Sequence, residues 1–289
     1  MNYQDENGER VAFVLSGGGP RGALEVGVLE ALFEQGIRPQ LLVGTSVGAI
    51  NATGIAIDPT QRGAATVVRQ WQMLNEKEIL PGNFLSMAWR LATGKKGLFS
   101  NRGLRHFIGS RVLRNVRTFA DIQAAELYIA AVKLDSGHLH VFGIDRSEPV
   151  LDALMATTAA TPWLPPWEYR GHLFVDGAFM SDLPIRIAVE MGATEIYAID
   201  VGVREKPRPK FWGILDVIQR VVNAVSYEHF QEDLQWAQKL PDGKVHYIRV
   251  RGFENVRIWQ LNHTAEMIEV GKRAALEHIA GLVPVSVKS

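Results

Sequence analysis

The chain contains no cysteine among its 289 residues. Disulfides, thiolate metal sites and a cysteine nucleophile are therefore excluded. A small secreted scaffold held together by disulfides is excluded with them. The redox state of the compartment stays open.

An excess of charge of either sign is also missing, because 31 basic residues balance 31 acidic residues. This balance gives no overall electrostatic reason to expect nucleic acid as a partner. Apolar residues make up 47% and charged residues 21% of the chain, which is typical of a globular protein.

Long hydrophobic runs are absent as well. The polar first ten residues lead into Val11–Leu15, an apolar run too short for a signal peptide or a membrane span. No other stretch approaches the roughly 18 apolar residues that a transmembrane helix needs. We expect a cytoplasmic protein that can touch a membrane surface without crossing the bilayer.

The N-terminal pattern predicts two strand–helix units. Val11–Leu15 indicates a short buried strand, and the helical pattern after it ends at Gly36. Leu41–Val43 predicts a second strand, and Val47–Ala52 can begin a second helix. Successive units of this kind predict an α/β fold with a parallel sheet covered by helices.

The rest of the chain predicts a single domain, residues 1–289, with a helical insertion. Residues 60–120 have a helical, glycine-interrupted pattern that is typical of an inserted cap. The remaining predicted elements are a hairpin of Leu127–Leu134 and His138–Phe142, a helix from Pro184 to about Gly192, a strand Glu195–Val201, a helix from Phe211, a strand Val245–Val250 and a helix from about Thr264 to Ala280.

Ser46 is the candidate nucleophile. It lies at the centre of Gly44-Thr45-Ser46-Val47-Gly48, a GxSxG motif at a predicted strand-to-helix junction. The flanking Gly44 and Gly48 permit a sharp turn that would expose the serine hydroxyl near the positive end of a helix. The alternative is that the two glycines only permit tight packing while Ser46 caps the helix.

A glycine-rich loop, Gly17-Gly18-Gly19-Pro20-Arg21-Gly22, follows the first strand. Its amides can surround a phosphate or an oxyanion. Gly17, Gly19 and Gly22 also satisfy GxGxxG, but the second strand ends in Gly44 and Thr45, without the acidic residue that a dinucleotide site requires. A GxxxxGK[ST] phosphate loop is absent too. The oxyanion interpretation is favoured, although Pro20 has no amide hydrogen to donate.

A serine nucleophile requires a base, and the chain has eight histidines, none in a recognisable motif. A late histidine such as His246 or His263 would suit a Ser-Asp-His order. The other candidate is Asp176, which follows a run of small residues and a turn rich in proline and aromatic residues. Taken alone, Asp176 before Gly177 is also typical of an ordinary turn.

The order of three motifs resembles the patatin-like phospholipases: a GGGxRG-type loop at Gly17–Gly22, GxSxG at Gly44–Gly48, and a DGA at Asp176–Ala178. The resemblance extends from about Val11 to Val203. It implies a three-layer α/β/α fold with a mostly parallel central sheet and a helical cap. It also implies a dyad without histidine, in which Ser46 is the nucleophile and Asp176 the base, and an oxyanion hole formed by the residues Gly17, Gly18, Gly19 and Arg21. We expect the pKa of Asp176 to be raised by a partly dry site.

The predicted activity is carboxylic ester hydrolysis on an acyl lipid or phospholipid, without a metal or an organic cofactor. Acyl transfer on the same fold and a non-catalytic lipid-binding role stay open. Aromatic residues near the predicted site, among them Trp163, Trp167, Phe99 and Phe107, suggest an apolar groove. Between Arg90 and Arg117 the chain carries eight basic and no acidic residues, a pattern that suits an anionic membrane surface or a solvated helix face. The oligomeric state is not defined by the sequence.

Overall fold

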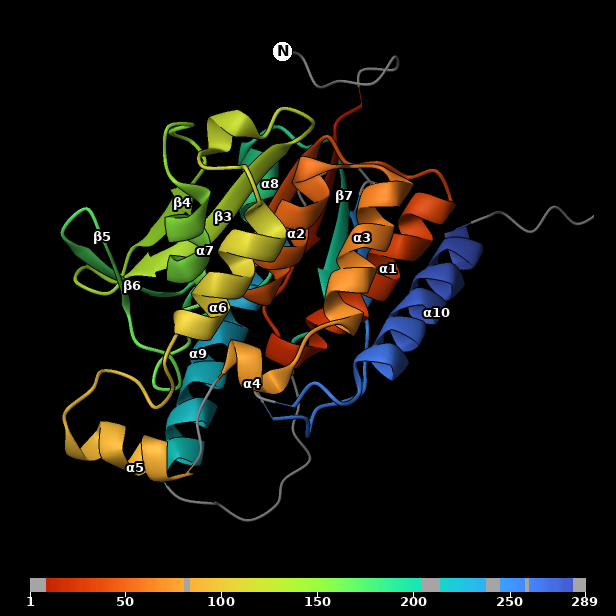
Figure 1. The fold of residues 1–289 in the computed structure, drawn as a ribbon. Coiled ribbons are helices and arrows are strands. Elements are labelled where there is room, and N and C mark those ends of the chain that lie inside the picture. The colour runs from red at the N-terminus through yellow and green to blue at the C-terminus, as the bar shows by residue number, and fades with distance from the viewer. Residues whose placement is uncertain (1–8, 81–83, 204–213, 238–244, 258–259, 283–289) are drawn as a thin grey trace, which may run out of the picture.

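The computed structural model describes residues 9–80, 84–203, 214–237, 245–257 and 260–282 (Figure 1). Within these residues the chain forms one eight-stranded sheet. The strands are β1 Val11–Leu15, β2 Leu41–Thr45, β3 Glu126–Lys133, β4 Leu139–Phe142, β5 Trp167–Tyr169, β6 His172–Asp176, β7 Glu195–Asp200 and β8 Val245–Arg249. The helices are α1 Gly22–Glu34, α2 Val47–Ile57, α3 Gln61–Gln72, α4 Glu76–Ile79, α5 Phe84–Ala92, α6 Arg102–Phe107, α7 Val150–Thr157, α8 Ile185–Glu190, α9 Ile214–Ala237 and α10 Thr264–Leu282, with the short helices η1 Gly19–Arg21, η2 Ile108–Leu113, η3 Phe119–Asp121 and η4 Gly177–Phe179.

The strand order is β5-β6-β3-β2-β1-β7-β8, with β4 paired to β3. Strands β3, β2, β1, β7 and β8 run parallel, whereas β4 and β6 are antiparallel to β3. The expected α/β fold with a mostly parallel central sheet is confirmed.

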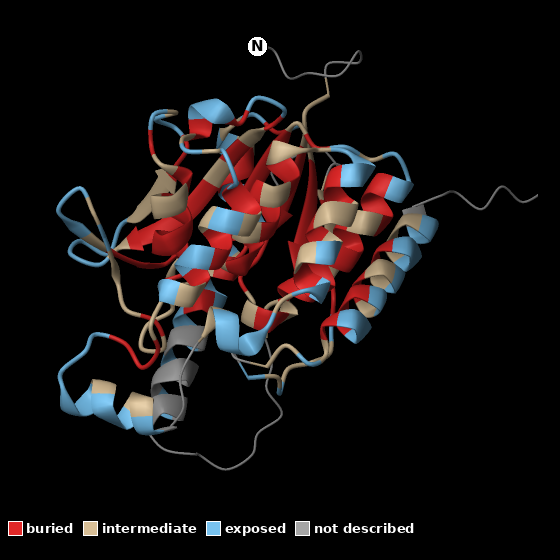
Figure 2. Cartoon of the chain, in the orientation of Figure 1, coloured by how far each residue is buried: buried red, intermediate tan, exposed pale blue. Residues whose placement is uncertain are grey.

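The sheet has a helical layer and an apolar core on each face. Alternate residues of a strand point to opposite faces, so Phe13 and Leu15 of β1 pack in one core while Ala12 and Val14 pack in the other. The larger core is covered by α1, α2, α3, α7 and α10, and the smaller one by α8 and α9. Figure 2 shows the buried sheet between partly exposed helices.

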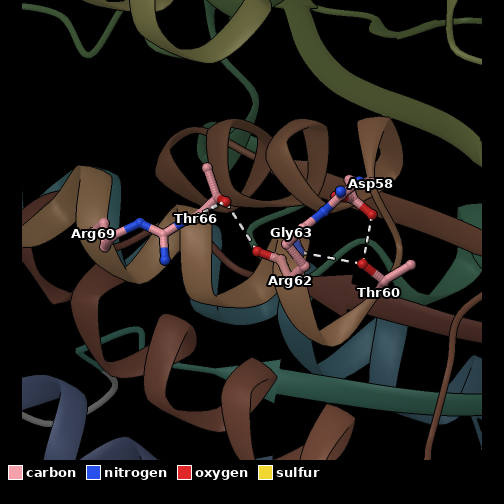
Figure 3. Close-up of polar contacts among 6 residues, drawn as sticks. All are labelled: Asp58, Thr60, Arg62, Gly63, Thr66 and Arg69. Carbon is pink, nitrogen blue, oxygen red and sulfur yellow. Dashed lines mark hydrogen bonds and ion pairs between the residues drawn. The ribbon is translucent and has the colours of Figure 1, made fainter.

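The turn from α2 to α3 is held by its own side chains (Figure 3). Thr60 is the N-cap of α3, where its hydroxyl accepts from the Gly63 amide at 3.3 Å and donates to Asp58 at 2.6 Å. A threonine at this position satisfies one of the free amides at the start of a helix. The cap fixes the start of α3, whose far end carries the buried Trp71.

Several predicted elements agree with the structure. Strand β1 has the predicted bounds, β3 and β4 form the predicted hairpin, and Pro184 is the N-cap of α8. The predicted start of the next helix at Phe211 lies outside the described residues, which resume at Ile214. Helix α7 and the β5–β6 hairpin were not predicted, because their short runs lack a clear period.

The segment 60–120 divides between two environments. Helix α3 lies in the main helical layer, where Ala64, Val67 and Trp71 join the larger core. Helix α5, in contrast, lies away from the sheet at the edge of the molecule (Figure 1). No helix in the described part of the chain combines the length and apolar character that a membrane span requires.

Helices α1 and α10 cross with their backbones in close approach. A Cβ atom at Gly27 would collide with the Ile268 carbonyl of α10, and one at Gly271 would collide with the Leu24 carbonyl of α1. Each glycine therefore makes room for the backbone of the other helix. This contact attaches the C-terminal helix to the first strand–helix unit.

We expect Gly27→Ala and Gly271→Ala each to lower the free energy of unfolding by at least about 1–3 kcal/mol, since the methyl group forces the two backbones apart. Urea denaturation followed by circular dichroism measures this loss. Gly281→Ala is the matched control in α10, because a Cβ atom there meets nothing within 4 Å. Equal effects at the three positions would contradict the proposed packing constraint.

Candidate active site

Ser46 lies in a strained turn between β2 and α2. Its backbone angles are φ 54° and ψ −125°, a region that residues other than glycine rarely occupy. A Cβ atom at Gly44 would come within 2.6 Å of the Ala49 amide nitrogen, and one at Gly48 within 2.5 Å of the Ser16 carbonyl oxygen. The two glycines therefore permit the sharp turn, and the serine lies at its apex.

Asp176 lies beside Ser46 although 130 residues separate them. The Ser46 hydroxyl donates to Asp176 Oδ2 at 2.7 Å, and the Ala178 amide donates to Oδ1 at 2.9 Å. Sheet register creates this proximity, since Thr45 pairs with Ala130 on β3 and Asp176 pairs with the adjacent Ala131. At Gly177 a Cβ atom would collide with the Ala130 carbonyl, so the tight turn after Asp176 requires glycine.

Burial raises the pKa of Asp176 to about 7, and the nearby negative charge of Asp182 adds to the rise. The hydrogen bonds from Ala178 and Ser46 oppose it by stabilising the carboxylate. A carboxyl group with a pKa near neutrality can both accept a proton and return it at neutral pH. The direction agrees with the upward shift expected from the sequence.

The glycine loop lies against the Ser46 turn. A Cβ atom at Gly17 would lie 3.5 Å from Ser46 Cβ, and Gly19 has a φ of 57°, which favours glycine. The Gly17 amide donates to both the carbonyl and Oδ1 of Asp182 at 3.1 Å. This amide is thus engaged by Asp182, and its role as an oxyanion donor stays a prediction. The amides of Gly18 and Gly19 form no hydrogen bond with other described residues.

The remaining loop residues have structural contacts. Pro20 is buried and lines the cavity beside Ser46, so it supplies apolar surface. Arg21 Nε donates to the Val201 carbonyl at 2.9 Å, which ties the loop to the end of β7, and its place in the oxyanion hole stays a prediction. Gly22 begins α1 where a Cβ atom would come within 2.5 Å of Val47 Cγ2.

Two neighbouring polar residues were not predicted. Thr157 at the end of α7 accepts from the Ser46 amide at 2.8 Å and donates to the Ala130 carbonyl at 2.6 Å. Asp182 is buried and holds the Gly17 amide. Both lie in the segment that carries Asp176, but neither has a motif of its own.

An apolar cavity of about 120 Å³ opens beside Ser46. It is lined by Gly19, Pro20, Ser46, Val47, Ile50, Trp71, Leu74, Glu76, Ile79, Leu80, Leu104, Phe107, Thr158, Ala160, Leu164 and Leu261. Of the aromatic residues expected to form a groove, Phe107 lines the cavity. Phe99 belongs to the larger core, and Trp163 and Trp167 are partly buried against it. Trp71 and Leu164 contribute instead.

The late histidines have other partners. His246 stacks on Tyr197 and lies 2.9 Å from Glu195 Oε1, while His263 faces Glu266 at 3.3 Å. His172 pairs with Asp135 at 3.2 Å on the surface. Among the described residues, no group of three or more histidine or acidic side chains has a metal-binding arrangement.

These features define an α/β protein with a serine at a strand-to-helix turn, hydrogen bonded to a buried carboxylate beside an apolar cavity. The family model described as patatin-like phospholipase matches residues 13–189. The chain belongs to the patatin-like phospholipase family.

Named relatives agree with this assignment. Human patatin-like phospholipase domain-containing protein 6 is 27% identical over 69% of this chain, and Drosophila melanogaster neuropathy target esterase sws is 28% identical over 68%. A lysophospholipase of Saccharomyces cerevisiae is 25% identical over 72%. The matches span only 14%, 13% and 12% of those longer proteins.

The crystal structure of VipD from Legionella pneumophila has a similar fold, with a TM-score of 0.52 at 12% identity. The match covers 96% of this chain and 69% of VipD.

As the pH rises from 5 to 8, we expect the free energy of unfolding of the unmodified protein to fall relative to that of Asp176→Asn. The folded protein holds the Asp176 proton up to a pKa of about 7, whereas the unfolded chain releases it near 3.8. The unmodified protein therefore loses stability through this window by about 2–3 kcal/mol, and the uncharged amide does not.

Urea denaturation of both proteins at several pH values measures the difference. Glu168→Gln is the control, because Glu168 is an exposed carboxylate away from the site. A difference between Asp176→Asn and the unmodified protein that does not change with pH would refute the raised pKa.

Proposed function

We propose that the protein hydrolyses the carboxylic esters of acyl lipids, with Ser46 as nucleophile and Asp176 as general base. The observation that supports this most directly is the 2.7 Å hydrogen bond from Ser46 Oγ to Asp176 Oδ2 at the edge of an apolar cavity. We also propose a single functional domain, because the lining of this cavity runs from Gly19 to Leu261 and includes residues of the 60–120 segment.

In the acylation step, Ser46 Oγ attacks the ester carbonyl carbon while Asp176 Oδ2 accepts the hydroxyl proton. The carbonyl oxygen becomes an oxyanion, which the Gly18 and Gly19 amides are suited to bind. The carbon–oxygen bond to the alcohol then breaks, and Asp176 returns the proton to the departing oxygen. The acyl group remains on Ser46 as an ester.

In the deacylation step, a water molecule attacks the acyl-enzyme carbonyl carbon and Asp176 accepts its proton. The bond to Ser46 Oγ breaks, the proton passes to the serine oxygen, and the free fatty acid leaves. One carboxyl group thus serves both steps, which requires a pKa near the working pH. The value of about 7 for Asp176 satisfies this requirement.

The substrate class follows from the lining of the cavity. Most of the lining side chains are apolar, and among them Trp71, Leu104 and Phe107 are buried. Such a surface binds an acyl chain and offers little to a charged ligand. The names of the related lysophospholipase and esterase are consistent with lipid esters.

We expect Ser46→Ala and Asp176→Asn each to lower kcat for a lipid ester by at least about 10³-fold, because each removes a group that acts in both steps. For the unmodified protein, kcat/KM should rise with pH through about 7 as Asp176 becomes ionised. Fatty acid release from lysophospholipids and nitrophenyl esters measures both effects.

Ser110→Ala, at an exposed serine, is the matched control. Mass spectrometry of the products separates free fatty acid from an acyl group transferred to an added alcohol. Full activity in both site variants, or no hydrolysis by the unmodified protein, would refute the proposed function.

We further expect Ile79→Trp to reduce hydrolysis of long-chain esters by about tenfold or more while short-chain esters are affected less. Ile79 is half-buried at the cavity wall, and a larger ring there occupies space that a long chain needs. The ratio of kcat/KM across a series of acyl lengths is the measurement. Ile187→Val, in the core on the opposite face of the sheet, serves as the control. An unchanged ratio would mean that the acyl chain binds elsewhere.

A further inference from the structure

Large apolar side chains are exposed along one short part of the chain. Met73, Leu85, Trp89 and Leu91 have exposed fractions of 67%, 76%, 68% and 65%. Single exposed apolar residues are ordinary on protein surfaces, but clusters indicate a site of interaction. In the sequence, these exposed residues stand before and after Leu74, Glu76, Ile79 and Leu80, which line the cavity.

Helix α5 turns its apolar face toward solvent. Leu85, Ala88, Trp89 and Ala92 have the spacing of one helical face, and all four are exposed. Figure 2 shows most of α5 in the colour of exposed residues. Met87 of the same helix packs against the larger core. A helix in contact with water normally presents polar residues on its outer face. The opposite arrangement suits a helix whose outer face contacts an apolar phase.

The chain that follows α5 attaches it to the cavity wall. Arg90 Nε donates to the Gly97 carbonyl at 2.7 Å, and the Leu98 amide donates to the Pro162 carbonyl at 3.0 Å. Leu164, two residues beyond Pro162, lines the cavity. Figure 1 shows α4 and α5 at the end of the molecule where the parallel strands finish, which is also the end that carries Ser46.

The segment that carries α5 is basic, whereas the preceding helix α4 carries the exposed acids Glu76 and Glu78 beside Lys77. No aspartate or glutamate occurs from residue 79 to residue 120, and Lys95 and Lys96 are exposed directly after α5. Some basic residues between Arg90 and Arg117 lie away from this face. Arg111 pairs with Glu78 at 3.7 Å, and the Arg117 carbonyl accepts from Val150 near the Thr118–Pro149 bridge, close to the start of β3.

We propose that the exposed face of α5 with Leu85 and Trp89, together with the exposed Lys95 and Lys96, forms a membrane-docking surface for bilayers with anionic headgroups. The apolar side chains would enter the boundary between headgroups and acyl chains, and the two lysines would contact lipid phosphates. Because the docked face adjoins the cavity, a lipid could pass from the bilayer to Ser46 without crossing water. This last consequence rests on the proposed function, whereas docking itself does not.

The test measures binding separately from catalysis by using Ser46→Ala protein. Sedimentation with phosphatidylcholine vesicles, with and without phosphatidylglycerol, gives the bound fraction. We expect binding to the anionic vesicles, and a loss of about tenfold for Leu85→Gln or Trp89→Gln. Ile144→Gln is the matched control, because Ile144 is 63% exposed and lies away from Ser46. It follows Gly143, where a Cβ atom would meet the carbonyl of Leu127 near the start of β3.

A second pair of variants tests where the charge acts. Lys95→Glu with Lys96→Glu should reduce binding to anionic vesicles by about tenfold or more, whereas Arg114→Glu with Arg117→Glu should change it little. Both pairs lower the net charge equally, and all four residues are exposed. Equal losses for the two pairs would show general attraction to the vesicle and would overturn the proposed surface.

Hydrolysis of a soluble short-chain ester separates the two proposals. We expect Leu85→Gln and Trp89→Gln in the active protein to retain it while losing hydrolysis of vesicle lipid. Unchanged vesicle binding in both variants would overturn the docking surface. Loss of vesicle binding with full hydrolysis of vesicle lipid would overturn only the passage of lipid from the docked face to Ser46. A different outcome would also overturn the docking surface: the unmodified protein does not bind vesicles, light scattering shows that it is a dimer, and Trp89→Gln converts it to a monomer.

Discussion

The hydrogen bond between Ser46 and Asp176 depends on the register of three strands. Strand β2 ends at Thr45, opposite Ala130 of β3, and β6 brings Asp176 opposite Ala131. A slip of one residue in either pairing would turn the side chains to the other face of the sheet. The register is held by strands that are apolar on both faces, since β2 is buried along its whole length and Leu127, Ile129 and Ala131 of β3 pack in the larger core. The site is therefore a consequence of how the core packs.

Burial of the aspartate links the stability of the fold to its chemistry. The dry surroundings disfavour the carboxylate and raise the pKa of Asp176 to about 7, while the Ala178 amide and the Ser46 hydroxyl partly compensate for the lost hydration. The strained Ser46 turn adds a second local cost. Packing of the surrounding layers offsets both unfavourable free energies. These layers also hold the loop after Asp176 from two sides, because Thr45 donates to the Ser181 carbonyl and Ser226 of α9 donates to the Ala178 carbonyl.

Helix α9 thus connects the smaller core to the site. Its Asp233 is buried and accepts from the Ser181 hydroxyl at 2.8 Å, and burial raises the pKa of Asp233 to about 7. At the other end of the site, α5 has an apolar outer face and few polar groups, a surface that is unfavourable in water. In the described residues, a well-packed serine site therefore lies next to a helix that exposes large apolar side chains to water.

The sequence by itself determined the local parts of this protein. The buried first strand, the glycine loop and the Gly44–Gly48 turn follow from short patterns, because sharp turns and close backbone approach require glycine at particular positions. Asp176 came from the order of three motifs, since its own neighbourhood resembles an ordinary turn. Only the tertiary structure decided that Thr157 holds the Ser46 amide, that Asp182 occupies the Gly17 amide, and that Trp71 and Leu261 line one cavity. These contacts join residues that lie far apart in the chain, and no local pattern specifies a distance that packing alone creates.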